Sequence, residues 1–303
     1  MSAREVTILI LMCLVWGFHF VVIKTAVTQL PPIFYAAVRM TLVAALMAPF
    51  LRWRKGQMAR IFGGGICLGV LNYSLMFTGL KFATASTSAI AMELYVPFAT
   101  ILSFLFLGDK FGLQRSLGIA LAFAGVAVIA LAGSDEVGPE TRLKLGIGLV
   151  AAGAFVEAVG AVFVKQSVSF KPHELMAWFG VIGAIGLWIM TAVFESGQQE
   201  AFAASNKTQM IGAILYSAVG ASIFGHTAYY WLIKRLPVSL VAPSVLLTTV
   251  IAVFSGVFLL GDPFGVPMII GGLMTLAGVG VVLLRTAKKQ DIKAPLNESG
   301  ITP

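Results

Sequence analysis

Ten apolar runs, each about as long as a membrane-crossing helix, occupy most of the chain. About twenty helical residues cross a hydrocarbon core of about 30 Å. Because lipid offers no hydrogen-bond partner to an open backbone, each run must be helical. The runs lie at 5–24, 33–51, 61–80, 83–106, 112–132, 144–165, 174–194, 209–233, 238–260 and 265–285. They predict an all-α membrane protein with ten transmembrane helices.

The composition excludes a water-soluble domain. Of the 303 residues, 58% are hydrophobic and only 11% are charged, against about 25% charged in soluble proteins. The formal charge of +8 does not indicate nucleic-acid binding, because the basic residues lie between the apolar runs and form no face with interleaved aromatics. Cys13 and Cys67 lie inside apolar runs and indicate neither a disulfide nor a metal site. We expect no cofactor.

The charges between the runs predict the orientation. The first run lacks an A-x-A cleavage site and ends at Lys24, so we interpret it as a retained span rather than a signal peptide. Fifteen Lys and Arg lie on the side of the two termini and five on the other, with Arg39 inside a span. The positive-inside rule then places both termini in the cytoplasm. We expect a monomer, with an oligomer as the alternative, surrounded by lipid in a bacterial inner membrane, and a polar, disordered tail at 287–303.

The sequence contains an internal repeat. A shift of 153 residues places Gly108, Asp109, Phe111 and Gly112 on Gly261, Asp262, Phe264 and Gly265. Nearer the start of each half, a shift of 141 residues places Lys24 on Lys165 and Pro31 on Pro172. We therefore predict two repeats, 1–134 and 135–286, each with five spans.

An odd number of spans makes the second repeat enter the membrane from the opposite face. Inverted repeats are chiefly a transporter architecture and favour alternating access at the repeat interface. The alternative is that duplication only built a larger scaffold.

Polar groups at mid-span are costly in a bilayer and mark a candidate substrate pathway. Aromatic rings among them are suited to stacking on a flat apolar ligand or holding a cation. The candidate substrate-binding residues are Trp16, His19, Asn72, Tyr73, Phe77, Glu93, Tyr95, Glu157, Ser222, His226, Tyr229, Tyr230, Ser244 and Thr248.

Several of these polar residues have two interpretations. Glu93, about ten residues from each end of its span, either binds a substrate ammonium group or a proton, or is protonated and bonded to a neighbouring helix. His19 and His226 could titrate, but we favour hydrogen bonds to neighbouring helices. For Arg39 we favour a structural anchor that snorkels or pairs with an acid. Pro97 is expected to interrupt the fourth span.

A family resemblance rests on Trp16-Gly17, on Pro32 followed by Arg39, on the two Gly-Asp turns and on the segment Glu93 to Pro97. Together they resemble the drug/metabolite transporter superfamily, EamA type, over nearly the whole chain, and most of all the YddG-type exporters of aromatic and neutral amino acids. The resemblance implies ten helices around a central cavity lined by spans 1, 3, 4, 6, 8 and 9. Small multidrug relatives place a working Glu in their first helix; here Glu157 has this place in the second half, but Trp16 has it in the first.

Three functions are then in view. The first is a secondary transporter that exports aromatic or neutral amino acids and related small metabolites. The second is a proton-coupled exporter of cationic drugs, which the missing acid in the first half weakens. The third is a non-transporting scaffold or a membrane enzyme. Against an enzyme, His173-Glu174 begins the zinc motif H-E-x-x-H but Ala177 replaces its last histidine, and no G-x-S-x-G motif occurs.

Overall fold

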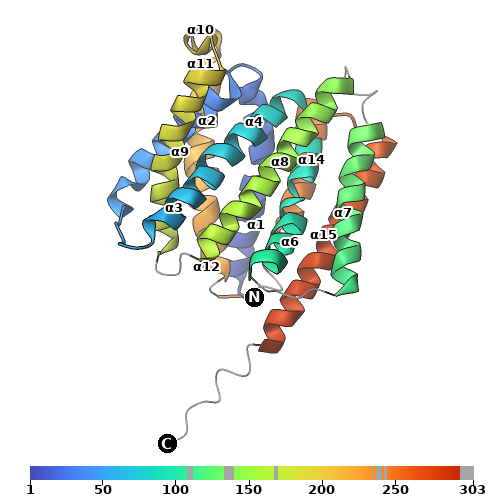
Figure 1. Ribbon diagram of the computed structural model, residues 1–303. Coiled ribbons are helices and arrows are strands. Elements are labelled where there is room, and N and C mark those ends of the chain that lie inside the picture. Colours follow the sequence, from blue (N-terminus) through green and yellow to red (C-terminus); the bar gives the residue numbers. More distant parts are fainter. Residues whose placement is uncertain are drawn as a thin grey trace, which may run out of the picture.

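The protein is a bundle of helices (Figure 1). The computed structural model describes residues 1–107, 112–132, 140–166, 170–233, 235–236, 241 and 244–293, and none of these residues is in a strand. Within these ranges, nine helical segments are long and apolar enough to cross a membrane, and Ser244–Leu260 is a shorter apolar helix. The prediction of an all-α membrane protein with ten spans is confirmed.

The helices follow the predicted spans closely. Those of the first half are α1 (Ala3–Val27), α2 (Pro32–Met47), η1 (Ala48–Phe50), α3 (Met58–Gly65), η2 (Ile66–Leu71), α4 (Asn72–Phe82), α5 (Ala85–Met92), α6 (Tyr95–Leu107) and α7 (Leu113–Ala132). Those of the second half are α8 (Glu140–Lys165), α9 (Pro172–Phe194), α10 (Gln198–Ala204), α11 (Lys207–Leu215), η4 (Tyr216–Gly225), α12 (His226–Ile233), α14 (Ser244–Leu260) and α15 (Val266–Lys293). The first part of the predicted tail is helical, because α15 continues to Lys293; residues 294–303 lie outside the described residues.

The fourth span is broken between α5 and α6, at Glu93 and Leu94. The cause is Pro97, which has no N–H to donate to the carbonyl four residues earlier and whose ring would collide with it. That carbonyl belongs to Glu93, and it accepts instead from the N–H of Val96 at 3.1 Å. The break therefore turns the chain at an acidic side chain in mid-membrane.

The third and eighth spans each contain a π-helical segment, η2 and η4. Shifted by the repeat interval of 153 residues, η2 falls on 219–224, inside η4. Such wide turns are rare and are frequently found at functional sites. In η4, the Ser222 hydroxyl donates to the carbonyl of Ser217, five residues earlier, at 3.1 Å.

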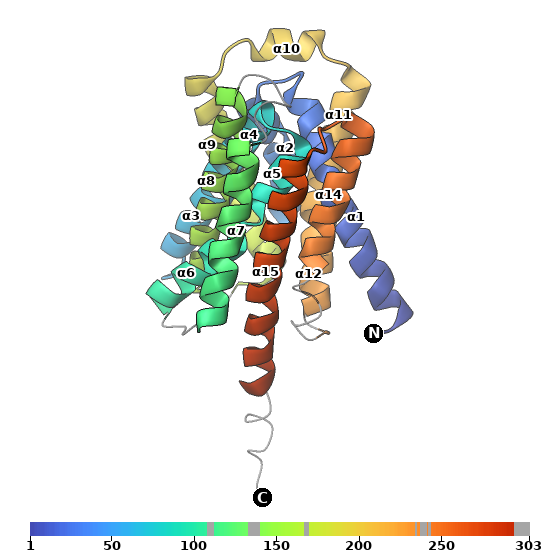
Figure 2. The ribbon, with the colours of Figure 1, turned by 90° about the vertical axis from the view of Figure 1, so that its right-hand side faces the viewer.

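Helices α7 and α15 lie against each other in Figures 1 and 2, and their contacts are reciprocal. A methyl group on Gly118 would collide with the carbonyl of Gly278, and one on Gly125 with the carbonyl of Gly271. Under the 153-residue shift, Gly118 corresponds to Gly271 and Gly125 to Gly278. Each contact is therefore the image of the other, as two halves related by an approximate two-fold axis require.

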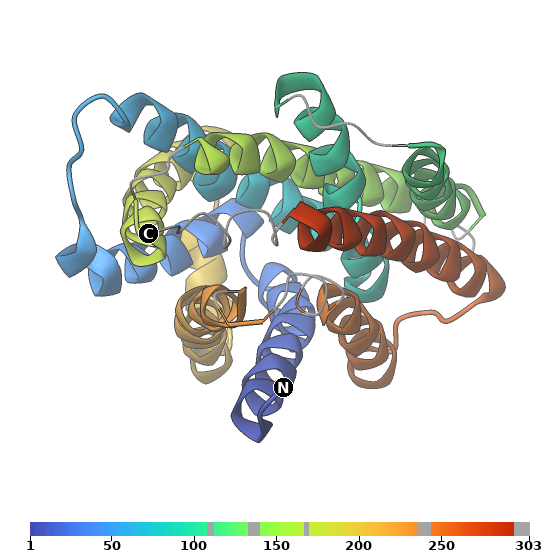
Figure 3. The ribbon, with the colours of Figure 1, turned by 90° about the horizontal axis from the view of Figure 1, so that it is seen from below.

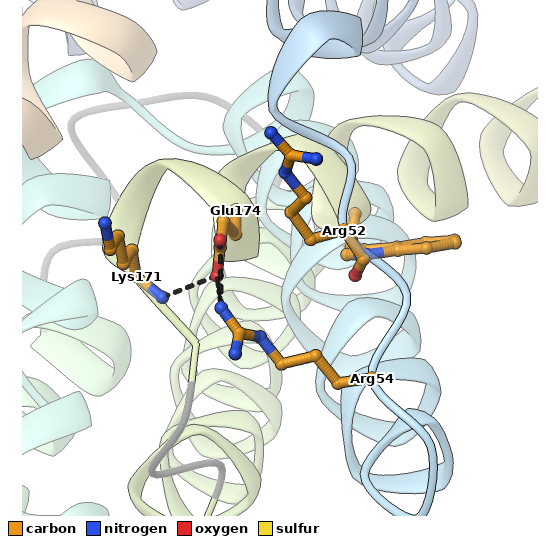
Figure 4. A network of polar contacts seen from close by, with 5 residues as sticks. Arg52, Arg54, Lys171 and Glu174 are labelled. Atoms are coloured by element: carbon orange, nitrogen blue, oxygen red, sulfur yellow. Dashed lines mark hydrogen bonds and ion pairs between the residues drawn. The ribbon is translucent and has the colours of Figure 1, made fainter.

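Helices α2 and α9, which correspond under the 141-residue shift, are joined at both ends. At one end, Glu195 accepts from the backbone N–H groups of Ile33 and Phe34 at 2.9 and 2.8 Å. At the other end, the carboxylate of Glu174 accepts from the backbone N–H of Lys171, at the start of its own helix, at 2.9 Å. It also accepts from the guanidinium of Arg54, at 2.8 Å to one oxygen and 3.0 Å to the other (Figure 4). Each carboxylate stabilises a helix N-terminus while it links the two halves.

The bundle has two ends, which we name by what lies there: the N-terminal end and the α10 end (Figure 2). At the α10 end, the ammonium group of Lys24 donates to the carbonyls of Leu80 and Ala83 at 2.8 and 2.6 Å. Gly261, with φ of 70°, makes the predicted turn after α14, and the next residue, Asp262, accepts from Ser86 N and Oγ at 2.8 and 2.7 Å. The Lys24 bonds thus tie α1 to the end of α4 within the first half, and the Ser86–Asp262 bonds join the two halves at this end. The corresponding turn at Gly108-Asp109 lies outside the described residues.

Replacing Gly125 by alanine is expected to lower the thermal unfolding temperature in detergent, with a cost of about 1–3 kcal/mol from overpacking against α15. Gly148→Ala is the matched control, since a Cβ there meets no atom within 4 Å; alanine favours helix over glycine, so its unfolding temperature should stay the same or rise. Equal unfolding temperatures for the two variants would contradict the close approach of α7 and α15.

Candidate functional site

A cavity of about 540 Å³ lies between the two halves. Figure 3 shows the bundle from its N-terminal end. The cavity extends towards this end as far as Lys165, the last residue of α8, and Pro172, the first residue of α9. All six spans that the resemblance implies contribute to the lining, and α2 and α9 contribute as well. The volume is in the range of small-molecule sites.

Most of the predicted site residues come together in this cavity. Those that line it are Trp16, His19, Asn72, Tyr73, Phe77, Glu93, Tyr95, Glu157, Ser222, His226, Tyr229 and Thr248. Ser244 is not among the lining residues: it is buried at the start of α14, where its hydroxyl donates to the carbonyl of Val241 at 2.6 Å. The side chain of Tyr230 lies outside the described part of the chain. That these residues bind substrate stays a prediction.

One aromatic group is built around Trp16. Its ring centroid lies 5.4 Å from that of His226 and 5.7 Å from that of Tyr229. The indole N–H donates to the carbonyl of Ala221, in the π-helical segment η4, at 2.9 Å. This bond holds the ring against the second half and leaves its apolar surface on the cavity.

A second aromatic group lies in the first half. The ring of Phe77 is 5.6 Å from Tyr73 and 5.7 Å from Tyr35. The guanidinium of Arg39, half-way along α2, lies over these rings, 4.5 Å from the centroid of Tyr73 and 5.5 Å from that of Phe77. It also donates to Ser222 Oγ at 2.7 Å.

The predicted interpretation of Arg39 needs correction. The residue is 2% exposed, so it does not snorkel to the membrane surface. Among the described residues no carboxylate lies within ion-pair distance of it, and its Nε and Nη1 have no hydrogen-bond partner. The sequence signal was its place as the one Lys or Arg predicted inside a span; its position on the cavity wall follows only from the packing of α2.

Glu93 lies at the break between α5 and α6 and is 5% exposed. One carboxyl oxygen, Oε1, accepts a hydrogen bond from the hydroxyl of Thr249 in α14. The other, Oε2, is buried without a hydrogen-bond partner in the described part of the protein. The contact to α14 agrees with the interpretation that a neighbouring helix holds this acid, and the second oxygen remains available to a ligand.

Glu157 and Asn72 form a pair across the two halves. The amide of Asn72 donates to Glu157 Oε2 at 3.2 Å and to the carbonyl of Gly153 at 3.0 Å. The amide thus orients the acid and at the same time fastens α4 to α8. Glu157 presents a second carboxyl group to the cavity.

Only His19 makes the hydrogen bond to a neighbouring helix that we favoured from the sequence; His226 bonds within its own span. His19 Nε2 lies 3.0 Å from Ser217 Oγ, on the neighbouring segment η4. His226 Nδ1 lies 2.9 Å from the carbonyl oxygen of Ser222, one turn earlier in its own span.

Sequence reasoning missed a set of methionines. Met40, Met76, Met92 and Met176 also line the cavity. Methionine is flexible and polarizable, and it adapts to ligands of different shape. Within an apolar span, the sequence does not distinguish a methionine that lines a cavity from one that faces lipid. Among the described residues, no group of three His, Cys, Asp or Glu could hold a metal ion.

Comparison with known proteins gives a consistent result. The EamA-like transporter family matches the chain over residues 3–131 and again over 144–284. A "Probable amino-acid metabolite efflux pump" of Salmonella typhimurium is 26% identical over 300 residues, which cover 95% of this chain and 99% of that protein. A protein of Escherichia coli with the same description is 25% identical over 286 residues, covering 92% of this chain and 94% of that protein.

The fold has also been seen by crystallography. A solved crystal structure covers 96% of this chain and 100% of its own chain, with a TM-score of 0.63 and 16% sequence identity. At this identity the likeness shows the fold alone.

Substituting Thr249 by valine is expected to cost about 1–3 kcal/mol of stability, because it removes the hydroxyl that donates to the buried Glu93. The adjacent Thr248→Val is a matched control: Thr248 Oγ1 is buried without a partner in the described residues, so its loss should be neutral or stabilising. Thermal unfolding of both proteins in detergent measures the difference. A Thr248→Val protein no more stable than Thr249→Val would argue against the Thr249–Glu93 bond.

Proposed function

The chain belongs to the EamA-like transporter family, and on this premise we propose that it exports aromatic and other neutral amino acids and related small metabolites. Its family and its relatives make it a multi-pass membrane transporter of small molecules and not an enzyme. The observation that carries the proposal on substrate is the cavity, in which aromatic rings and buried carboxyl groups lie together.

The two kinds of lining match the two parts of such a substrate. The rings around Trp16 and Phe77 offer flat apolar surfaces to an aromatic or aliphatic side chain. The carboxyl groups of Glu93 and Glu157 offer oxygen acceptors to an ammonium group. The methionines between them tolerate side chains of different size, in keeping with a class of substrates rather than one.

Transport by alternating access accounts for the difference between the two ends. The cavity extends to Lys165 and Pro172 at the N-terminal end, whereas Lys24, Ser86 and Asp262 join elements at the α10 end. We assign the moving units to the repeats 1–134 and 135–286, with 287–303 as a cytoplasmic tail. The excess of basic residues on the side of the termini supports a cytoplasmic N-terminal end, and we assign the protein to the bacterial inner membrane. The cavity would then be loaded from inside the cell, as export requires.

A flux assay tests the proposal. Purified protein in proteoliposomes is expected to accelerate the movement of labelled phenylalanine, tryptophan and threonine. Trp16→Ala should reduce phenylalanine flux by roughly two- to tenfold, the worth of one aromatic contact. Trp231→Ala is the control, because Trp231 does not line the cavity and packs instead against Arg4 and Arg235. If the unaltered protein moves none of the three amino acids, the proposed substrate class is wrong.

A proton-coupled exporter of cationic drugs is the second candidate, and the specific observation in its favour is Glu157 on the cavity wall. We expect Glu157→Gln to slow phenylalanine flux together with any flux of a cation such as tetraphenylphosphonium, since the carboxyl group would face the positive charge of either. Loss of cation flux with phenylalanine flux intact would favour the drug exporter. Glu200→Gln, on the exposed helix α10, is the control.

A further inference from the structure

We propose that Arg39 binds a carboxylate group of the substrate, so that the cavity selects molecules with a carboxylate and, together with Glu93, zwitterionic amino acids. This inference rests on the proposed function and adds to it the chemical group that every preferred substrate must carry. It reverses the structural role that the sequence suggested for Arg39.

The first observation is an uncompensated charge. A guanidinium is always protonated in proteins, and that of Arg39 is 98% buried on the cavity wall, in the middle of a membrane-spanning helix. Its partners in the described residues are two neutral hydroxyl groups, Ser222 Oγ at 2.7 Å and Tyr73 OH at 3.4 Å, and the faces of two rings. A buried charge is ordinarily paired with an opposite one.

The second observation is unused hydrogen-bonding capacity. The guanidinium has five N–H groups, and those on Nε and Nη1 have no acceptor in the described part of the protein. Hydroxyl and ring contacts hold the planar group in place without saturating it. A carboxylate would supply both the missing acceptors and the missing negative charge, in the strongest kind of hydrogen bond available to arginine.

The third observation is that the carboxyl group of Glu93 lines the same cavity as Arg39. Glu93 Oε2 has no hydrogen-bond partner among the described residues, while Oε1 is held by Thr249. A cation and an acid that face one cavity without pairing with each other match a ligand that carries both charges. The rings of Tyr73 and Phe77 beside Arg39 leave an apolar surface for the rest of the substrate.

Three ligands that share a phenyl ring distinguish recognition of the carboxylate from recognition of the ammonium group. Phenylalanine carries both charges, 3-phenylpropionate carries only the carboxylate, and 2-phenylethylamine carries only the ammonium group. Thermal stabilisation of the purified protein in detergent measures the binding of each. For Arg39→Gln, the concentrations of phenylalanine and phenylpropionate that give half-maximal stabilisation are expected to rise about tenfold or more, and that of phenylethylamine to change less than about twofold. Arg60→Gln, an exposed arginine that bonds a backbone carbonyl outside the cavity, is the matched control and should resemble the unaltered protein.

A measurement on the unaltered protein guards against a variant that fails to fold. Phenylalanine should stabilise it, and phenylalaninamide, which lacks the carboxylate, should do so at least about tenfold more weakly. Equal effects of the amide and the acid would overturn the proposal. The proposal would also be overturned if Arg39→Gln weakened the binding of all three ligands equally. It would likewise be overturned if Arg39→Gln bound phenylalanine and 3-phenylpropionate as well as the unaltered protein does.

The same ligands in the flux assay keep the two proposals distinct. Stabilisation by the carboxylates without any flux would contradict the proposed export and leave the role of Arg39 standing. Flux of phenylalanine with equal handling of phenylalaninamide would contradict the role of Arg39 and leave the export standing.

Discussion

The constraint on which the rest of this structure depends is that a polar group inside the bilayer finds its partners within the protein. Lys24 meets it by donating to carbonyls at the end of α4, and the carbonyl of Glu93, freed by Pro97, meets it by accepting from Val96. Trp16 and His19 each use an atom of η4. Against this background the buried groups without a partner in the described residues stand out. Those of Arg39, Glu93 and Thr248 belong to residues that line the cavity, whereas Ser88 in α5 does not line it, and Arg54 and Gln57 lie in the segment before α3.

The same constraint explains how the two halves are joined. Helices α7 and α15 approach through glycines, where the backbones come close enough for van der Waals contact without side chains between them. Helices α2 and α9 are instead joined by carboxylates at their ends, through Glu195 and Glu174. The two helices of each pair correspond to each other under the repeat shifts. The chemistry at corresponding places differs all the same: Glu195 corresponds to Arg54 under the 141-residue shift.

The spans were predictable because the thickness of the bilayer requires about twenty apolar residues in each helix that crosses it, and such runs can be recognised in the sequence. Most predicted boundaries lie within about three residues of the observed helix ends. The mid-span polar residues were predictable for the same reason, and most of them line the cavity. Ser244 was misplaced because depth in the membrane can be counted along the chain, whereas the direction of a side chain depends on helix packing. The role of Arg39 was hidden for a related reason: the sequence contains acids that it could have paired with, and only the tertiary structure places them elsewhere. The π-helical segments carry no sequence signal that we recognised.

Those two segments have a consequence for the history of the protein. Under the repeat shift the 6 residues of η2 fall inside the 10 residues of η4, so both halves carry the wide turn at a corresponding place. Duplication of a single five-helix unit that already carried this turn would give such an arrangement. The reciprocal glycine contacts between α7 and α15 would then have the form of a self-complementary homodimer interface, in which two copies of such a unit meet through the same patch.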